Sequence, residues 1–453
     1  MEGTFFRKYF LKKVIILSTG SVKGFSQHFD GRCVIVAQTF MSITETVIKP
    51  RSFTNVRRLP AQNRKIATWL SFLLIPLSGL ITDIYIPSMP HMAQDLHQSE
   101  SAIQLTLTLF LISYGASQFI AGNLIDSFGR FRLTLFSLGV FVISNLVIIN
   151  TRHIELIYTM RIVQGITTGF IVTAKRAYFV DMYEGERRKH YLSMMSIVWS
   201  SAPVVAPFIG GYLEKYFNWQ ANFYVLAGYG LIMLVLEWIF SGETVPAWRS
   251  FRLTYIIRDY RIMLRDRLFV CGILICGLAY GSTMIFGLSG AFIIEHRLGF
   301  SPVVAGYAAL VMGLAWMSGG FLGKALIRRS FLPKLRLSNI LQIIFIALMI
   351  ISSMWLYNIY SLLFFAFLVH LCVGFMFNNY FAFCLGRFPK MAGVASGFAG
   401  GSNYIITSIA SYAAVGLLKP QDQLELGWGY LVMAILAFVI LQWVLKKHLF
   451  KTA

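Results

Sequence analysis

The sequence predicts an all-α membrane protein of twelve transmembrane helices arranged as two bundles of six. Twelve long apolar stretches follow one another, and the lysines and arginines gather on alternate connections between them. Each stretch has about 18 to 27 residues, enough to cross a hydrocarbon core of about 30 Å as a helix. The expected spans are 67–88, 101–121, 133–150, 153–174, 190–213, 221–241, 268–293, 302–323, 337–357, 360–385, 391–417 and 428–445.

The positive charge predicts the orientation of these spans. Nearly all of the 40 Lys and Arg residues lie in the two tails and in the connections that follow the even-numbered spans. The exceptions are Arg152, Lys215, Arg297 and Lys419 on the other side, and Arg161 inside a span. Because cytoplasmic loops carry the excess of positive charge, we expect both termini in the cytoplasm. The net charge of +21 then belongs to loops that flank a membrane and does not indicate binding to nucleic acid.

Composition agrees with this class and argues against an enzyme. Charged residues make up 13% of the chain and hydrophobic residues 57%, as expected for a chain solvated by lipid. Four of the five cysteines lie in apolar spans and none shows metal-ligand spacing, so we predict neither a disulfide framework nor a metal site. We find no nucleophile–base set and no phosphate-binding loop, so we expect no enzyme and no cofactor.

The spans repeat with an offset of about 200 residues, which indicates two related halves. The connection between them contains Pro246 and alternates arginines with apolar residues, so we expect a short helix along the inner surface. The predicted organisation is a cytoplasmic tail at 1–66, a first bundle at 67–241, a linker at 242–267, a second bundle at 268–446 and a tail at 447–453.

The first part of the chain is basic and has no clear period. Its segment from Phe5 to Leu17 could lie on an anionic membrane surface. The interpretation we favour is that this tail is disordered or dispensable, with Met41 as an alternative translation start, in which case residues 1–40 are not part of the native protein.

Asp83 is the first candidate for function, because a carboxylate late in span 1 is costly to bury and should face a polar cavity or a partner. Burial favours its protonated form, which would allow exchange of a proton near neutral pH. The alternative is an acid at a helix end that water solvates or that caps span 2. Pro87 and Pro90 follow, so we expect the helix to kink or end there.

Arg161 is the second candidate, since a buried arginine needs a partner. It lies about 12 Å from the outer end of span 4, and Asp83 lies about 8 to 10 Å from the same face, so the two could pair directly or through water. A purely structural pair is the alternative. Gln164 lies one turn further in, whereas Glu155 and Glu237 lie near span ends, where we expect solvation at the membrane interface.

The connection between spans 2 and 3 reads GNLIDSFGRFRL, from Gly122 to Leu133. Gly122 and Gly129 are expected to supply a tight turn. Asp126 can accept hydrogen bonds from backbone N–H groups at a helix start, and Arg130 fixes the loop to the cytoplasmic side. We therefore expect a short, glycine-dependent loop here.

Span 5 contains the motif APVVAPFIGG. Its prolines, Pro203 and Pro207, should bend the helix, while small residues at every fourth position, with Gly210 and Gly211 among them, allow close contact with another helix. We expect a kinked helix at an interface.

Together these motifs resemble the major facilitator superfamily. G-x-L-x-D-x-x-G-R in the 2–3 connection is similar to the signature of the superfamily. R-x-x-Q-G in span 4 and the motif of span 5 are similar to those of its drug–proton antiporters with twelve spans. D-x-Y-x-P-x-M-P in span 1 and FPKMAGVASG at 388–397 resemble its bicyclomycin-resistance (Bcr/CflA) branch. The resemblance covers about residues 65 to 448.

The resemblance implies roles for the marked residues. Asp83 would take part in proton coupling, and Arg161 with Gln164 in proton transfer or substrate binding. At the cytoplasmic gate, Arg130 would pair with Asp181, and Asp126 would contact the start of span 11 at Ala392 and Gly393. Pro203 and Pro207 would hold the halves together. Spans 1, 4, 7 and 10 would line a central cavity, in which a substrate would contact Tyr85, Gln164, Tyr280, Asn379 and Phe381.

The sequence also departs from the family pattern. Ser127 and Phe131 stand where basic residues are usual, which implies a weaker gate, and Ile75 stands where some multidrug relatives carry a second acid. One membrane carboxylate suggests simple coupling and gives less support for strongly cationic substrates.

The expected function is therefore proton-coupled efflux of a small amphipathic molecule across a bacterial inner membrane by a monomer. A metabolite exporter, a nutrient symporter and a non-transporting membrane receptor remain as alternatives.

Overall fold

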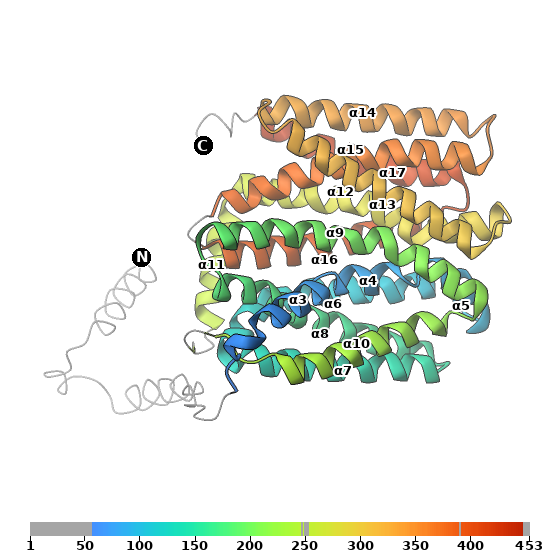
Figure 1. The fold of residues 1–453 in the computed structure, drawn as a ribbon. Helices are drawn as coiled ribbons and strands as arrows, with labels where there is room; N and C mark the ends of the chain where they lie inside the picture. Colours follow the sequence, from blue (N-terminus) through green and yellow to red (C-terminus); the bar gives the residue numbers. More distant parts are fainter. Residues whose placement is uncertain (1–56, 246–247, 249–252, 389–390, 447–453) are drawn as a thin grey trace, which may run out of the picture. The chain divides into compact units, whose positions relative to one another are not determined.

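Long α-helices that run side by side make up the part of the chain that the structure describes (Figure 1). This computed structural model describes residues 57–245, 248, 253–388 and 391–446. The interpretations of the segment from Phe5 to Leu17, of the start at Met41 and of the tail at 447–453 lie outside these residues. The helices are η1 (Ala61–Asn63), α3 (Arg64–Leu74), α4 (Leu77–Asp83), η2 (Ile86–Ser88), α5 (Met89–Asp95), α6 (Glu100–Phe128), α7 (Arg130–Asn150), α8 (Ile154–Met182), α9 (Gly185–Tyr216), α10 (Gln220–Phe240), α11 (Leu253–Arg265), α12 (Arg267–Phe292), η3 (Ile293–Arg297), α13 (Pro302–Ala325), α14 (Phe331–Ser352), α15 (Ile359–Gly386), α16 (Ala392–Leu418) and α17 (Gln423–Lys446).

Ten segments of the described chain are long and apolar enough to cross a membrane, whereas the sequence predicted twelve spans. The other two expected spans are α9 and α16, which have 32 and 27 residues and are therefore long enough. Both contact helices of either half, and α9 carries an uncharged, largely apolar stretch from Leu192 to Ile209.

The first predicted span is a broken helix rather than a continuous one. Its first part, α3, ends at Leu74, and Pro76 separates it from α4, which ends at Asp83. Pro87 and Pro90 then lie in the short helices η2 and α5, so the break that was expected at these prolines is present. Discontinuous helices are a common way of placing polar groups inside a membrane protein. Here the breaks put Asp83 at a helix end within the protein.

Two groups of helices form the halves of the protein. In the first half, which comprises α3 to α10, α6 packs on α8, α8 on α7 and α7 on α10. In the second half, which comprises α12 to α17, α13 packs on α15, α12 on α16 and α17, and α14 on α15 and α17. These contacts form two bundles, and one hydrophobic core cluster extends through both of them.

The halves meet along two close helix pairs, α9 with α13 and α6 with α16 (Figure 1). On the first, a methyl group added at Gly306 would lie 2.7 Å from the carbonyl oxygen of Pro207, and one at Gly211 would lie 2.6 Å from that of Pro302. On the second, Gly115 and Gly401 face each other's carbonyl oxygens at similarly short range. Larger side chains at these positions would push the halves apart.

The expected surface helix of the linker is α11. It contacts both halves through Tyr260, whose hydroxyl donates a hydrogen bond to the carbonyl oxygen of Phe119 at 2.5 Å. The Tyr260 ring also packs 4.7 Å from that of Phe398 on α16. Burial, with help from the neighbouring Asp259, raises the pKa of Tyr260 to about 12.

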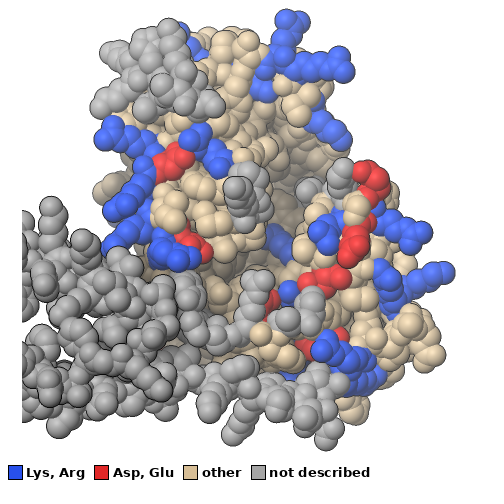
Figure 2. Space-filling model, turned by 90° about the vertical axis from the view of Figure 1, so that its left-hand side faces the viewer, with Lys and Arg blue, Asp and Glu red and all other residues tan. Residues whose placement is uncertain are grey.

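Lysines and arginines gather on the face of the protein that carries the start of α7 and the helix α11 (Figure 2). This face is hollowed between the two halves, with basic side chains around the hollow. The positive-inside rule predicts that this is the cytoplasmic face.

Candidate transport site

A cavity lies between the two halves and contains Asp83. The centre of a water molecule can occupy about 70 Å³ of this cavity, so the cavity has room for a few water molecules. Its walls come from α4, η2 and α9 of the first half and from α12, α13 and α15 of the second. The lining residues are mostly apolar or aromatic, and they include Ile86, Trp199, Pro203, Pro207, Tyr280, Thr283, Met284, Phe286, Met312, Trp316 and His370.

Asp83 is the acid of this cavity. Its side chain is 5% exposed, and its Oδ2 has no hydrogen-bond partner. The helix α4 ends at this residue, because the chain turns into η2 after it. The carboxylate is therefore placed at the meeting point of the halves, where its charge would be costly and a proton would remove that cost. The structure does not show the solvated helix-end acid or the cap of span 2 that the sequence left open.

His370 on α15 is the second titratable group in the cavity, and sequence reasoning missed it. It is 1% exposed, its Nδ1–H donates to the carbonyl oxygen of Ala366 at 2.8 Å, and its Nε2 has no partner. The bond to Ala366 fixes the neutral tautomer with a free acceptor at Nε2. A polar residue inside span 10 was the available signal.

Arg161 does not line the cavity, although it is fully buried. Its guanidinium carbon lies 4.5 Å from the centre of the Tyr85 ring and 4.7 Å from that of Phe110. Its Nη1 donates to Gln164 at 2.9 Å, and its Nε donates to the carbonyl oxygen of Thr106 at 3.3 Å. Arg161 therefore braces α8 against α6 and the end of span 1.

The expected pair between Asp83 and Arg161 is not formed in the structure. No ion pair joins them in the described chain, and Arg161 instead uses the aromatic ring of Tyr85 and neutral oxygens as partners. Similar depth was the basis of the prediction, but Arg161 lies against Tyr85, whereas Asp83 faces the cavity. Depth along the membrane does not determine the direction in which a helix presents a side chain.

Of the five expected substrate contacts, Tyr280 alone belongs to the cavity lining. The other four make internal contacts. Tyr85 hydrogen-bonds Thr106 at 3.0 Å, and Gln164 donates to Asn145 at 3.1 Å. Asn379 donates to the carbonyl oxygen of Phe375 at 2.8 Å, and Phe381 stacks on Phe377. The cavity is lined by spans 5 and 8 in place of span 4, because the bent α9 and the facing α13 approach the centre.

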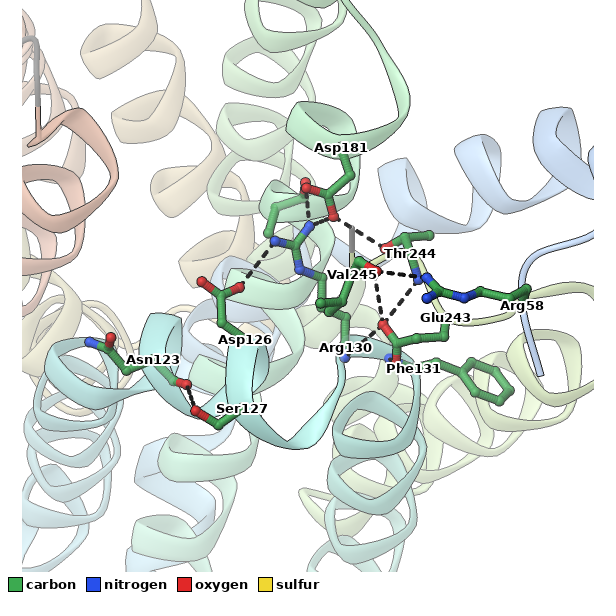
Figure 3. A network of polar contacts seen from close by, with 11 residues as sticks. Arg58, Asn123, Asp126, Ser127, Arg130, Phe131, Asp181, Glu243, Thr244 and Val245 are labelled. Carbon is green, nitrogen blue, oxygen red and sulfur yellow. Dashed lines mark hydrogen bonds and ion pairs between the residues drawn. The ribbon is translucent and has the colours of Figure 1, made fainter. Parts of the chain in front are cut away.

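Arg130 and Asp181 form an ion pair at the cytoplasmic end of the first half (Figure 3). Arg130 also reaches Asp126 at 3.1 Å and the carbonyl oxygen of Ala177 at 3.0 Å. These contacts fasten the end of α6 and the start of α7 to the end of α8.

Glu243, which follows α10, completes this network and was not anticipated. Its carboxylate accepts hydrogen bonds from the backbone N–H groups of Arg130 and Phe131, each at 3.2 Å, and so caps the start of α7 (Figure 3). Gly129 has a φ of 97°, and a methyl group there would lie 2.5 Å from Glu243 Oε2. The cap therefore requires glycine at this position.

The connection from Gly122 to Leu133 is shorter than expected, because α6 continues to Phe128 and α7 begins at Arg130. Gly122 lies within α6, with open space around it, and does not form a turn. Asp126 is in the last turn of α6, so the helix-capping role predicted for it falls to Glu243.

The expected contact between Asp126 and the start of α16 is not seen. The Asp126 carboxylate is bonded to Arg130, and Gly393 has open space where a side chain would begin, while the side chain of Ala392 lies outside the described part of the chain. The helices α6 and α16 do touch further in, at Gly115 and Gly401. The two halves thus separate toward the cytoplasmic face, which agrees with the hollow in Figure 2.

The span-5 motif lies at the contact between the halves. Pro203 and Pro207 are inside the continuous helix α9, where they line the cavity and face α13. Gly211 abuts Pro302 of the second half, and Gly210 packs tightly on Ile84.

Glu237 corrects a further expectation. It is fully buried and pairs with Lys175 at 2.6 Å rather than lying at the membrane interface. A partner on another helix allows this burial, and the partner was not visible from its position near a span end.

A helical membrane protein with two halves around a central, acid-containing cavity is a transporter by architecture. The chain belongs to the Major Facilitator Superfamily, whose sequence profile matches residues 71–411. Membership of this family of transporters does not indicate an enzyme.

Three relatives are similar over most of their length. They are "Uncharacterized MFS-type transporter YdgK" of Bacillus subtilis (26% identical, covering 77% of this chain and 88% of the relative), "Bicyclomycin resistance protein homolog" of Haemophilus influenzae (26%, covering 77% and 89%) and "Multidrug resistance protein D" of Escherichia coli (27%, covering 82% and 93%). Solved structures agree on the fold. The nucleoside transporter NupG superposes with a TM-score of 0.66 at 14% identity over 85% of this chain and 100% of that one. The D-xylose-proton symporter gives 0.62 at 15% identity over 83% and 96%.

Proposed function

We propose that the protein exports small amphipathic molecules in exchange for protons and that Asp83 carries the exchanged proton. The observation that supports this most directly is the position of Asp83, a buried carboxylate with an unpartnered oxygen that lines the cavity between the halves. A group there can lose its proton to one side of the membrane and regain it from the other as access alternates.

The cavity chemistry supports an amphipathic substrate. Trp199, Met284 and Trp316 offer apolar and aromatic surface, while Asp83 from the first half and Thr283 and His370 from the second half offer polar groups. Such a site binds molecules that are mostly apolar and carry hydrogen-bond donors, because the Asp83 carboxylate and His370 Nε2 can both accept. When protonated, Asp83 becomes a donor itself, and a bound amine or hydroxyl loses its acceptor. Proton binding and substrate binding at Asp83 then exclude each other, as exchange requires.

The energy available for exchange is sufficient for a useful gradient. One pH unit supplies about 1.4 kcal/mol per proton, and 100 mV supplies about 2.3 kcal/mol more. Together these would sustain a concentration ratio of several hundredfold for a neutral substrate that moves against one proton.

Two relatives, a multidrug resistance protein and a bicyclomycin resistance homolog, support export as the direction. We extend the proposal to a monomer in a bacterial inner membrane with both termini in the cytoplasm, on the charge bias of the connections.

The test uses the purified full chain in liposomes with an imposed pH gradient and ethidium as the probe. We expect ethidium to accumulate in the acidic interior of vesicles in which the cytoplasmic ends of the protein face outward. Asp83→Asn should abolish this uptake. Glu155→Gln, an exposed acid on α8 outside the cavity, is the matched control and should transport normally. Transport by Asp83→Asn at the wild-type rate would overturn the role of Asp83.

The direction of proton movement separates export from uptake. An internal pH dye should report proton release from the liposomes when ethidium enters them. Proton entry together with the probe would support a symporter, and the absence of any coupled flux across a broad panel of compounds would support a non-transporting receptor.

A further inference from the structure

Two histidines and three glutamates lie together at the outer ends of the halves. His91 on α5 points its Nδ1 toward Glu214 Oε1 on α9 at 3.3 Å and toward Glu295 Oε2 on η3 at 3.6 Å. The first two residues belong to the first half and Glu295 belongs to the second. The imidazole thus bridges the two halves.

Both carboxylates of this bridge are enclosed. The side chains of Glu214 and Glu295 are each 7% exposed, whereas that of His91 is 43% exposed. Glu214 Oε2 and Glu295 Oε1 have no hydrogen-bond partner. Two buried acids that share one partly exposed imidazole and keep free oxygens form a site with unused capacity for protons.

His296 makes a second bridge in the opposite direction. It belongs to the second half, and its partners lie on the first half, with Glu100 Oε1 at 3.2 Å from Nδ1 and Gln94 Nε2 at 3.1 Å from Nε2. The amide of Gln94 can only donate through nitrogen, so Nε2 accepts and Nδ1–H donates to Glu100.

The local fold brings this cluster together. The helix α12 ends in the π-helical turn η3, which directs Glu295 and His296 toward the first half. Just inside, Gln104 on α6 donates to the carbonyl oxygen of Leu288 on α12 at 2.9 Å. The outer ends are therefore closed by polar contacts, while the opposite face is hollowed (Figure 2).

We propose that His91, Glu214 and Glu295 form a second proton-binding site, which latches the outer ends of the two halves together while it holds a proton. While a proton is on the imidazole or on either carboxyl group, the site joins the two acids from opposite halves. Once the last of these protons is lost, Glu214 and Glu295 face each other as two anions, and their repulsion favours separation. The other charged groups around the cluster are Asp95 with its partner Arg152, Lys215 beside Glu214, Arg297, and the pair of Glu100 with His296.

The sign of the pH response follows from this arrangement. The latch is closed while the site holds a proton, so it should be closed at acid pH and should open as pH rises and the site loses its last proton. A proton taken from the outside would thus close the outer side behind it, as inward proton movement requires.

The experiment follows the separation of the halves and uses neither a substrate nor an efflux readout, so its result does not depend on the proposed export function. Spin labels are placed at Phe217→Cys in the first half and Met354→Cys in the second, which are 73% and 72% exposed. The five native cysteines are replaced, and the full chain is studied in lipid nanodiscs by pulsed electron paramagnetic resonance between pH 5 and pH 8.

We expect the population with the longer label separation to grow several-fold from pH 5 to pH 8 in the wild-type background, as the site loses its last proton. Glu295→Gln leaves one acid at the site, so it should keep the shorter separation and remove the pH response. His91→Gln removes the imidazole that both acids share, so it should shift the pH at which the separation increases. His153→Gln, an exposed histidine on the same outer face, should behave as wild type. A distance distribution independent of pH in the wild type, or an unchanged response in His91→Gln, would overturn the proposal. If His91→Gln does not fold, the isosteric Glu295→Gln decides the question by the same measurement.

Discussion

Tyr85 lies between the two residues on which the sequence analysis placed proton coupling. Its ring covers the guanidinium of Arg161 at 4.5 Å, whereas Asp83, two residues earlier, faces the cavity. In this conformation the carboxyl group of Asp83 and the guanidinium of Arg161 therefore have separate environments. Asp83 lines a cavity with room for a few water molecules, and Arg161 belongs to a buried network with Gln164 and Thr106.

The first prediction concerns Arg161→Lys. Lysine keeps the charge but loses the planar contact with Tyr85 and Phe110 and at least one hydrogen bond, so we expect a loss of about 1–3 kcal/mol in unfolding free energy. Thermal unfolding in detergent should show a clearly lower midpoint, with Arg152→Lys, which is 70% exposed, as the control. A normal midpoint together with a shifted pH profile of transport would show instead that Arg161 acts on Asp83.

The second prediction concerns His370. Replacement by leucine removes a buried nitrogen that has no partner, which should raise stability by about 1–3 kcal/mol. It also removes the acceptor that the second half presents to the cavity, so ethidium transport in liposomes should fall strongly. His370→Gln, which retains an acceptor, should transport more than His370→Leu.

A matched control for His370 is Ser289→Ala. Ser289 is also buried with an unpartnered oxygen, but it does not line the cavity. Its replacement should raise stability and leave transport unchanged. If both variants lose transport equally, His370 has no particular role in the cavity.

The third prediction concerns the cytoplasmic end of the first half. Arg130→Ala breaks the contacts to Asp181, Asp126 and the Ala177 carbonyl, so α6, α7 and α8 should separate more readily. A cysteine placed at Thr283 in the cavity should then react faster with a membrane-impermeant maleimide from the cytoplasmic side. Arg132→Ala, at an exposed position on α7, is the control, and equal labelling rates in the two variants would remove the proposed fastening.

The fourth prediction compares two glycines of this region. Gly129→Ala forces a side chain into a left-handed backbone and against Glu243, which should cost about 1–3 kcal/mol of stability. Gly139→Ala, in the interior of α7 with open space around it, should stabilise the helix by about 0.5–1 kcal/mol. Thermal unfolding of both variants checks the pair, and a destabilised Gly139→Ala would show that the region tolerates no change at all.

The fifth prediction concerns Tyr260→Phe and pH. Loss of the hydrogen bond to Phe119 should cost about 1 kcal/mol. Since burial raises the pKa of Tyr260 to about 12, above its unfolded value of about 10, the contribution of the phenol is complete below pH 10 and is lost as pH rises through 12. The stability difference between wild type and Tyr260→Phe should therefore be constant from pH 6 to pH 9. A difference that shrinks within that range would contradict the bond.

The fold was largely predictable, because apolar length and charge bias act locally along the chain. The surface helix α11 and the break near Pro87 were expected and are present. The contact of the span-5 prolines with the second half is also where the motif suggested.

The site was less predictable, because it depends on rotation of helices about their axes and on partners far away in the chain. The depth of Asp83 and Arg161 in the membrane could be predicted, but not the direction in which each helix presents its side chain. Glu243 caps a helix more than a hundred residues before it, and no local pattern marks that role. His370 is a single polar residue in an apolar span, whose importance is visible only when Asp83 is placed beside the same cavity.

The ion pair between Lys175 and Glu237 has a consequence for biogenesis. Each residue lies on a helix long and apolar enough to cross the membrane, and each carries a charge that lipid solvates poorly. The helices α8 and α10 should therefore meet before either of them leaves the translocation channel. Insertion of span 4 would then wait for the synthesis of span 6, and loss of either charge alone should lower the amount of protein that reaches the bilayer.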